Sequence, residues 1–347
     1  MWSNSVTASR GAISAFVPAH GVVMYRVSTI DRRQARALPP HTMLSLAPAA
    51  AQLFTGRSTI VRETLTDDGP APVKRVKLTF RAGRGWRIKR LGRARVERLA
   101  PGHRYTVAFR VTAPVAGPPF ALAALSGGAS WDPVNGWRAT AAILGERVFA
   151  PVPPPYRTAD RTSQPAAFGA RDGAFAISAR GTGVLQPWNA PPTGSYAAIY
   201  EPQRAGVSST AQVTVTYDQA GGTAGGAGLI ERDAMTAPAA SPAGVVLFVN
   251  DAGTVVMSWN ATGGRNVDSR YAVQNAVVHE PVTLRLVRGG STYTGYYSTD
   301  AGVTWSPVDT VTVAPGASAG DQDVGVFHAS GLFTWTTTAT FKDFSVR

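Results

Sequence analysis

The segment Glu231-Arg232-Asp233 has the residue types and spacing that acid–base chemistry requires. Strand alternation would place Glu231 and Asp233 on one face of a sheet. A retaining glycosidase needs two carboxyl groups about 5–5.5 Å apart. In the glucanase pattern E-x-D-x-x-E, the final Glu supplies the second catalytic carboxyl group. The last position of that pattern is Thr236 in this sequence. We therefore expect a salt bridge from Glu231 to a neighbouring arginine, and we assign no catalytic residue.

A second chemically suggestive motif is Ser298–Trp305, which matches the Asp-box pattern S-x-D-x-G-x-T-W. In sialidases the Asp box recurs once in each propeller blade, whereas this sequence contains one copy. A single copy predicts a hairpin in which Asp300 accepts backbone N–H groups and Trp305 packs beneath the turn.

Metal-ligand patterns are weak. The chain has no cysteine, which excludes disulfides, Cys-ligated zinc and a thiol nucleophile. Five histidines are scattered without HExxH spacing, and we expect them on the surface or in turns. We predict no cofactor and no metal site, while a structural calcium stays open, with Asp300, Asp321 and Asp323 as candidate contributors.

Aromatic residues favour carbohydrate recognition, because exposed rings stack on the C–H faces of sugars while polar side chains fix the hydroxyl groups. Trp188 and Trp259 stand beside turn residues, which favours rim positions. The predicted carbohydrate-binding residues are Trp188, Tyr196, Trp259, Arg285 and Tyr297. The competing interpretation is that these rings pack in the core, as large aromatic side chains commonly do.

The charge is concentrated in the first half of the chain. The net charge is +13, and residues 1–150 hold 22 Lys/Arg against 7 Asp/Glu, whereas residues 151–347 hold 12 against 14. The run Arg81–Arg98 is the most basic stretch, but only Trp86 interleaves with it, so we predict no nucleic-acid partner. Loose attraction to acidic polysaccharide is the milder functional interpretation.

The elements that would carry these residues are short strands. Segments rich in Val, Thr, Tyr and Phe alternate with Gly, Pro, Asn and Asp turns, which predicts an all-β protein. About seven strands fall in residues 43–149 and about twelve in 157–347. Residues 31–42 and the Pro-rich residues 150–156 are predicted linkers. No run approaches the roughly 20 apolar residues of a membrane span, and the residues after Met1 lack a signal-peptide pattern.

Three family resemblances follow this division. The string Val17–Val27, with Gly11, Ile13 and Ala15 before it, resembles the end of the C-terminal β-domain of family-27 α-galactosidases. This resemblance covers residues 1–30. It implies that the catalytic (β/α)₈ barrel, with its aspartates, lies upstream of Met1.

Residues 43–149 resemble the immunoglobulin-like NEW-three domain associated with α-galactosidases, an accessory module. The resemblance lies in Gly85-Trp86, Leu99–Gly102, Tyr105–Val107 and Val111–Pro114.

Residues 157–347 resemble the concanavalin-A-like, or laminin-G-like, sandwich attached to many bacterial glycosidases. This resemblance lies in Ala227–Arg232, Thr283–Arg288, Thr294–Ser298 and Ala339–Val346. It implies glycan binding or a spacer role.

The sequence therefore predicts an immunoglobulin-like sandwich followed by a concanavalin-A-like jelly roll. It indicates an accessory, carbohydrate-binding or spacer region of a secreted, extracellular bacterial glycoside hydrolase of the α-galactosidase type. Its expected partners are a poly- or oligosaccharide and the upstream catalytic domain. Two alternatives stay open: a stand-alone cell-surface glycan-adhesion protein, and, less favoured, a concanavalin-like hydrolase that acts through Glu231.

Overall fold

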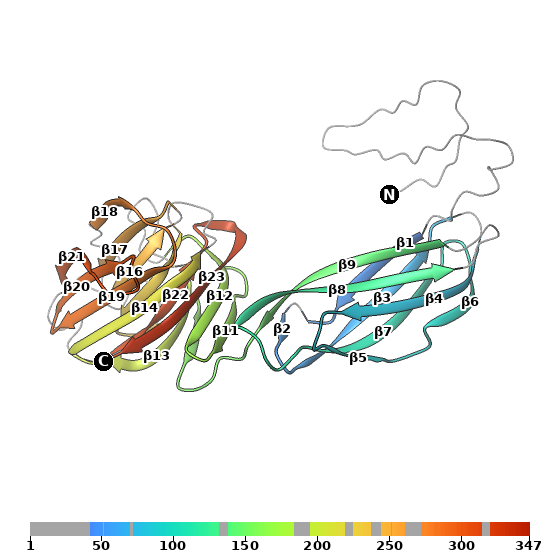
Figure 1. The fold of residues 1–347 in the computed structure, drawn as a ribbon, viewed down its shortest axis with the longest axis horizontal. Helices are drawn as coiled ribbons and strands as arrows, with labels where there is room; N and C mark the ends of the chain where they lie inside the picture. Colours follow the sequence, from blue (N-terminus) through green and yellow to red (C-terminus); the bar gives the residue numbers. More distant parts are fainter. Residues whose placement is uncertain are drawn as a thin grey trace, which may run out of the picture. The chain divides into compact units, whose positions relative to one another are not determined.

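The computed structural model describes most of the chain after residue 41 (Figure 1). The described residues are 42–50, 52–69, 72–131, 138–183, 195–218, 225–236, 244–250, 252–260, 272–313 and 320–347. All the regular elements in these ranges are strands, so the predicted all-β sandwich class is confirmed. The predicted remnant at 1–30 lies outside the described residues, as does the linker at 31–42 except for Thr42.

The first group of strands forms two sheets that face each other, here called the first sandwich. Its strands are β1 (Thr42–Pro48), β2 (Leu53–Phe54), β3 (Ser58–Asp67), β4 (Val73–Ala82), β5 (Arg87–Arg90), β6 (Arg95–Leu99), β7 (Arg104–Thr112), β8 (Phe120–Trp131) and β9 (Arg138–Phe149). One sheet has the order β1-β3-β7-β5 and the other β2-β9-β8-β4-β6. The side chains of Phe80 (β4) and Phe109 (β7) stack between the sheets with ring centroids 5.0 Å apart.

The remaining strands form the second sandwich. They are β10 (Arg157–Asp160), β11 (Ala167–Arg171), β12 (Ala174–Gly181), β13 (Ala197–Ala205), β14 (Ser208–Asp218), β15 (Gly226–Arg232), β16 (Gly244–Asn250), β17 (Thr254–Asn260), β18 (Ala272–Val277), β19 (Val282–Gly289), β20 (Thr292–Ser298), β21 (Ser306–Thr312), β22 (Gln322–Ala329) and β23 (Leu332–Val346). Two seven-stranded sheets result, β10-β13-β22-β15-β16-β17-β18 and β11-β12-β23-β14-β19-β20-β21. We call them the front sheet and the back sheet.

The core of the second sandwich lies between these two sheets. Alternate residues of each strand point inward, as in Ala227 and Leu229 of β15 and Leu284 and Leu286 of β19, and all four are buried. The front sheet carries a second buried apolar layer on its other face, which includes Tyr196, Phe248 and Phe327. Strands buried on both faces read as nearly continuous apolar runs, which explains why β15, β16 and β22 lack polar alternation.

The chain divides into two compact units, and short segments before residue 147 belong to the second. Segments Gln52–Gly56 and Val115–Leu122 belong with Arg147–Arg347. Arg171 of β11 donates hydrogen bonds to Gly117 O (2.7 Å) and Thr55 Oγ1 (2.8 Å), so these segments are tied to β11. Tyr156, inside the Pro-rich segment 150–156, packs its ring edge-on against Phe175 at 4.9 Å. The domain boundaries expected at 149 and 157 stay predictions.

Candidate functional site

The carboxylate of Glu231 is the catalytic candidate that the sequence offered, and it lies between the two sheets of the second sandwich. Glu231 follows Ala227 and Leu229 on the inward face of β15. Arg288 occupies the matching inward position on β19, and its Nη1 lies 3.4 Å from Glu231 Oε1. Both side chains are 0% exposed. The expected salt bridge to a neighbouring arginine is therefore confirmed.

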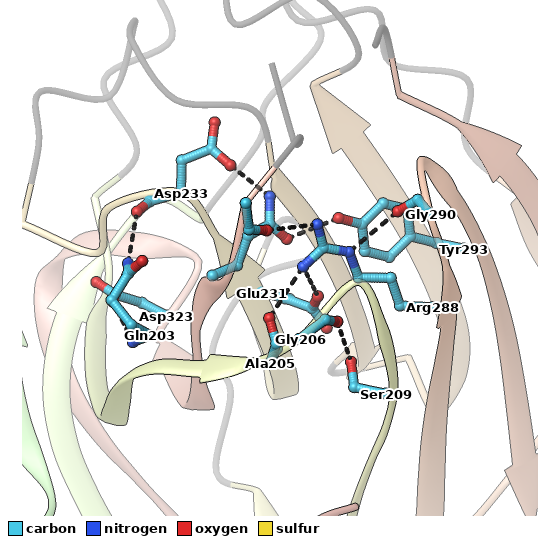
Figure 2. A network of polar contacts seen from close by, with 12 residues as sticks. Gln203, Ala205, Gly206, Ser209, Glu231, Asp233, Arg288, Gly290, Tyr293 and Asp323 are labelled. Carbon is cyan, nitrogen blue, oxygen red and sulfur yellow. Dashed lines mark hydrogen bonds and ion pairs between the residues drawn. The ribbon is translucent and has the colours of Figure 1, made fainter. Parts of the chain in front are cut away.

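Arg288 also holds three backbone segments (Figure 2). Its guanidinium donates to the carbonyl oxygens of Ala205 (3.0 Å), Gly290 (3.1 Å) and Gly320 (2.8 Å), and it lies 5.6 Å from the centre of the Tyr293 ring. A guanidinium has five N–H donors in a fixed fork, which suits a side chain that must bind several carbonyl groups at once. The side chain therefore ties the ends of β13 and β19 and the approach to β22.

A second set of polar contacts continues from this ion pair. Tyr293 donates its hydroxyl to Gln322 Oε1 (2.6 Å), and Gln322 in turn donates to the carboxylate of Asp233. The backbone carbonyl of Asp233 accepts from Gln203 Nε2 at 3.2 Å. Asp323 then accepts from the backbone N–H groups of Gln203 (2.9 Å) and Met235 (2.8 Å). Figure 2 shows Asp233, Gln203 and Asp323 on one side of the ion pair and Tyr293 on the other.

The electrostatics of Glu231 follow from its burial. Desolvation raises the pKa of Glu231 to about 7, although the nearby Arg288 cation acts in the opposite direction. Glu231 Oε2 has no hydrogen-bond partner among the described residues. A raised pKa suits a general acid, but a carboxyl group with no exposed surface has no access to a substrate. The arrangement is built to hold loops, and it does not favour the hydrolase alternative.

Three of the five predicted sugar-binding residues lie in the interior of the second sandwich. Tyr196, Trp259 and Tyr297 are all buried; Tyr196 donates to Met235 O at 3.2 Å and accepts from Arg232 at 2.5 Å. The expected rim position of Trp259 is thus corrected: the ring completes the core between the sheets. Trp188 lies outside the described residues. Sugar binding by these residues stays an untested prediction.

Arg285, the fifth predicted residue, lies on the outer face of the back sheet and is half-buried. Its guanidinium lies 3.6 Å above the centre of the Trp305 ring, and its Nε and Nη2 donate to Gln212 Oε1 at 3.2 and 2.9 Å. Tyr296 is its partner on β20. We call Gln212, Arg285, Tyr296 and Trp305 the arginine platform. All four are partly exposed, and they combine amide, guanidinium, phenol and indole groups on one surface.

The Asp-box prediction is confirmed. Asp300 accepts the backbone N–H of Thr304 at 2.9 Å and the hydroxyl of Thr304 at 2.6 Å, which lowers the pKa of Asp300 to about 2. Trp305 Nε1 donates to Gly302 O at 3.0 Å, and an added Cβ on Gly302 would lie 3.2 Å from the indole. The turn therefore positions Trp305 beneath Arg285, which gives this motif a role in the arginine platform.

The candidate calcium contributors lie in different surroundings. Asp300 is engaged in the Asp-box turn, and Asp323 is engaged with Gln203 and Met235. Within the described residues, no group of three or more His, Asp and Glu side chains is arranged to hold a metal ion.

One arrangement that sequence reasoning missed has the layout of an acid–base–hydroxyl relay. His328 Nε2 lies 2.9 Å from Thr337 Oγ1, and its Nδ1 lies 3.4 Å from Asp218 Oδ1 and 3.3 Å from Gly226 O. The expectation of a surface or turn histidine was wrong here, because His328 is fully buried. Burial lowers the pKa of His328 to about 4, so the imidazole is neutral near pH 7 and serves as a buried hydrogen-bonding group.

Sequence reasoning also missed Tyr296 and Gln212, although a signal for them was present. The Gly289-Gly290 turn predicts a hairpin, and the hairpin places Arg285 opposite Tyr296. Because Leu284 and Leu286 point inward, alternation sends Arg285 and its partner outward. The prediction of Tyr297 chose the residue of the opposite face.

A family model matches part of the first sandwich. Residues 53–123 match the NPCBM-associated, NEW3 domain of alpha-galactosidase. A comparison with curated protein sequences gave no match. Among the described residues, no helix is long and apolar enough to span a membrane.

Several solved structures are similar in part. The GH43 BlXynB protein from Bacillus licheniformis has 11% sequence identity and a TM-score of 0.40 over 87% of this chain and 64% of that chain. This chain thus spans less than two thirds of that protein. A xylan beta-1,4-xylosidase from Bacillus halodurans C-125 has 10% identity and a TM-score of 0.35, over 82% of this chain and 74% of that one. The alginate lyase from Klebsiella pneumoniae has 16% identity and a TM-score of 0.35, over 52% and 83%.

Proposed function

We propose that this chain is an accessory, carbohydrate-binding region of a secreted α-galactosidase-like glycoside hydrolase. The observation that carries the proposal is the match of residues 53–123 to the NEW3 domain of alpha-galactosidase. Such a region holds a tethered catalytic domain near its poly- or oligosaccharide substrate, which raises the effective substrate concentration without any chemistry of its own.

The buried state of Glu231 supports this accessory role over hydrolysis by the second sandwich. A glycosidase acid must contact the glycosidic oxygen, whereas Glu231 contacts Arg288 in a fully buried pair. The stand-alone adhesion protein is a weaker proposal, because the matched family model is described as a domain of alpha-galactosidase.

The arginine platform is the proposed glycan contact of the second sandwich. Arg285 is held by Gln212 and Trp305, so it is preorganised to donate to sugar hydroxyl groups at a low entropic cost. The partly exposed ring of Tyr296 next to it offers a surface for the C–H face of a sugar. Arg285 thus remains a carbohydrate-binding candidate, and Tyr296 replaces Tyr297.

Affinity electrophoresis of the whole chain through galactomannan and arabinogalactan tests the proposal. We expect the polysaccharides to retard the wild-type chain. Tyr296→Ala should raise the Kd at least about tenfold, which corresponds to a loss of about 1.4 kcal/mol in binding free energy. Tyr217→Ala is the matched control, since Tyr217 is also exposed on the second sandwich and lies outside the platform. Equal loss of affinity in both variants, or migration of the wild-type chain that neither polysaccharide slows, would refute glycan binding by the arginine platform.

Hydrolysis is measured in parallel with p-nitrophenyl galactosides. We expect no turnover by the chain. Turnover that Glu231→Gln abolishes, with unchanged folding by circular dichroism, would establish the hydrolase alternative instead.

A further inference from the structure

The first sandwich contains a groove of about 640 Å³ between its two sheets, lined by residues of β4, β5, β6, β7 and the segment between β5 and β6. Its floor is apolar. Phe80 and Phe109 stack there with an interplanar angle of 24°, next to Leu78 and Ala94. Phe80 is only half-buried, so part of its ring faces the groove. We call this feature the basic groove because of the residues on its rim.

The backbone around the groove is fixed to both sheets. After β5, Leu91 N donates to Ala108 O of β7 at 2.8 Å; before β6, Ala94 O accepts from Leu78 N of β4 at 2.8 Å. The Tyr105 hydroxyl donates to Arg93 O (2.7 Å) and Arg95 O (3.2 Å). The segment between β5 and β6 therefore holds its side chains in a defined position. Figure 1 shows β4, β5, β6 and β7 in the same unit.

The rim of the groove is cationic. Lys77, Arg90, Arg93 and Arg95 line it and are all exposed, and no acidic residue is among the lining residues. Within the described part of the chain, these four cations form no ion pair with a carboxylate. Four like charges around one apolar floor create a positive potential over the groove, which is strongest at low salt. This potential favours an anionic ligand.

We propose that the basic groove binds an acidic polysaccharide that carries uronate carboxylates. Guanidinium groups bind carboxylates through paired, charge-assisted hydrogen bonds, and the exposed part of Phe80 offers a surface for the C–H face of a sugar ring. The whole groove falls within residues 53–123, the segment that matches a glycosidase-associated domain. The proposal concerns a different surface from the arginine platform and goes beyond the proposed function.

The same observations favour a polysaccharide over a single-stranded nucleic acid. Nucleic-acid grooves of this kind stack successive bases on several exposed aromatic rings. In the basic groove Phe109 is buried, which leaves Phe80 as the partly exposed ring among the described lining residues. One ring and a cationic rim suit a repeating chain of charged sugars.

Isothermal titration of the whole chain with oligogalacturonate at low ionic strength tests the proposal, with a neutral galactomannan oligosaccharide as the uncharged comparison. The groove variant is Arg90→Gln/Arg95→Gln. The control is Arg87→Gln/Lys89→Gln, which removes the same charge from β5; Ile88 and Arg90 line the groove, whereas Arg87 and Lys89 do not.

We expect oligogalacturonate to bind the wild-type chain with an affinity that falls as salt is added. The groove variant should weaken this binding at least tenfold, and the control variant less than threefold. A further variant, Phe80→Leu, keeps an apolar side chain but removes the ring, and it should weaken uronate binding about threefold or more.

Three results would overturn the proposal: no binding of oligogalacturonate, equal losses in the groove and control variants, or tighter binding of a single-stranded oligonucleotide at the same salt concentration. If the wild-type chain binds oligogalacturonate but does not bind galactomannan, that result would instead refute the proposed role of the arginine platform. The two proposals therefore fail separately.

Discussion

The buried ion pair between Glu231 and Arg288 makes a stability prediction that can be worked from the structure. We consider Arg288→Met, which keeps an unbranched apolar side chain of similar length. The change leaves Glu231 buried without its cation, and it removes donors to the carbonyl groups of Ala205, Gly290 and Gly320. Removing one partner of a buried ion pair costs about 3–5 kcal/mol.

Two structural features set where in this range the cost falls. The orphaned carbonyl group of Ala205 raises it, because Ala205 is fully buried and an unsatisfied buried polar group costs about 1–3 kcal/mol; Gly290 and Gly320 are exposed, so water can replace their lost donors. Protonation of Glu231 lowers it, because burial already raises the pKa of this group to about 7. The neutral acid then avoids an isolated buried charge. We expect a loss of about 4 kcal/mol in the free energy of unfolding of the second sandwich.

Native-state hydrogen exchange read by mass spectrometry measures this loss, because peptides from β15 and β19 report on the second sandwich alone. A loss of about 4 kcal/mol corresponds to roughly a thousandfold faster exchange. Glu231→Gln should cost less, about 1–2 kcal/mol, because the amide still accepts from Arg288. The double variant should cost less than the sum of the single variants. A loss below 1 kcal/mol for Arg288→Met would refute the interpretation that this residue ties the loops.

Two further predictions concern carboxyl groups in opposite surroundings. Burial raises the pKa of Glu63 in β3 from 4.5 to about 7, so the stability that Glu63 contributes is fully present below about pH 4.5 and is lost as the pH rises toward 7. The Glu63→Gln variant should remove this loss and gain about 1–3 kcal/mol in the free energy of unfolding, measured with urea at pH 8. A variant as stable as the wild type at pH 8 would contradict this. Hydrogen bonds from Thr304 and Ser298 lower the pKa of Asp300 to about 2, so its stabilisation of the hairpin is present above about pH 4 and is lost as the pH falls through 2. Asp300→Asn should speed exchange of the Thr304 amide at pH 6, and unchanged exchange would exclude the carboxylate from the turn.

Local sequence determined the strands, the turns and the expectation that Glu231 pairs with an arginine. The alternation of branched and polar residues predicted an all-β chain because side chains on a strand alternate between two faces. The Asp-box residues Ser298–Trp305 predicted their own hairpin, since Asp300 and Thr304 bond within the same turn. Glu231 predicted a cationic partner, because a carboxylate on an apolar strand must be paired.

Tertiary structure alone decided which aromatic rings meet solvent. Tyr196, Trp259 and Tyr297 were expected at a sugar-binding surface but are buried. The front sheet is covered on both faces, and the second apolar layer that buries Tyr196 joins strands distant in sequence. Alternation tells which residues share a face, but it does not tell which of the two faces is covered by another layer.

The identity of the arginine partner and the basic groove likewise required the folded chain. Arg288 meets Glu231 only because two sheets face each other and bring β15 and β19 together. The run Arg81–Arg98 showed its charge in the sequence, but not that Arg90, Arg93 and Arg95 converge on one apolar floor while Arg87 and Lys89 do not line it. Charge is a property of composition, whereas convergence depends on the crossing of the chain from one sheet to the other.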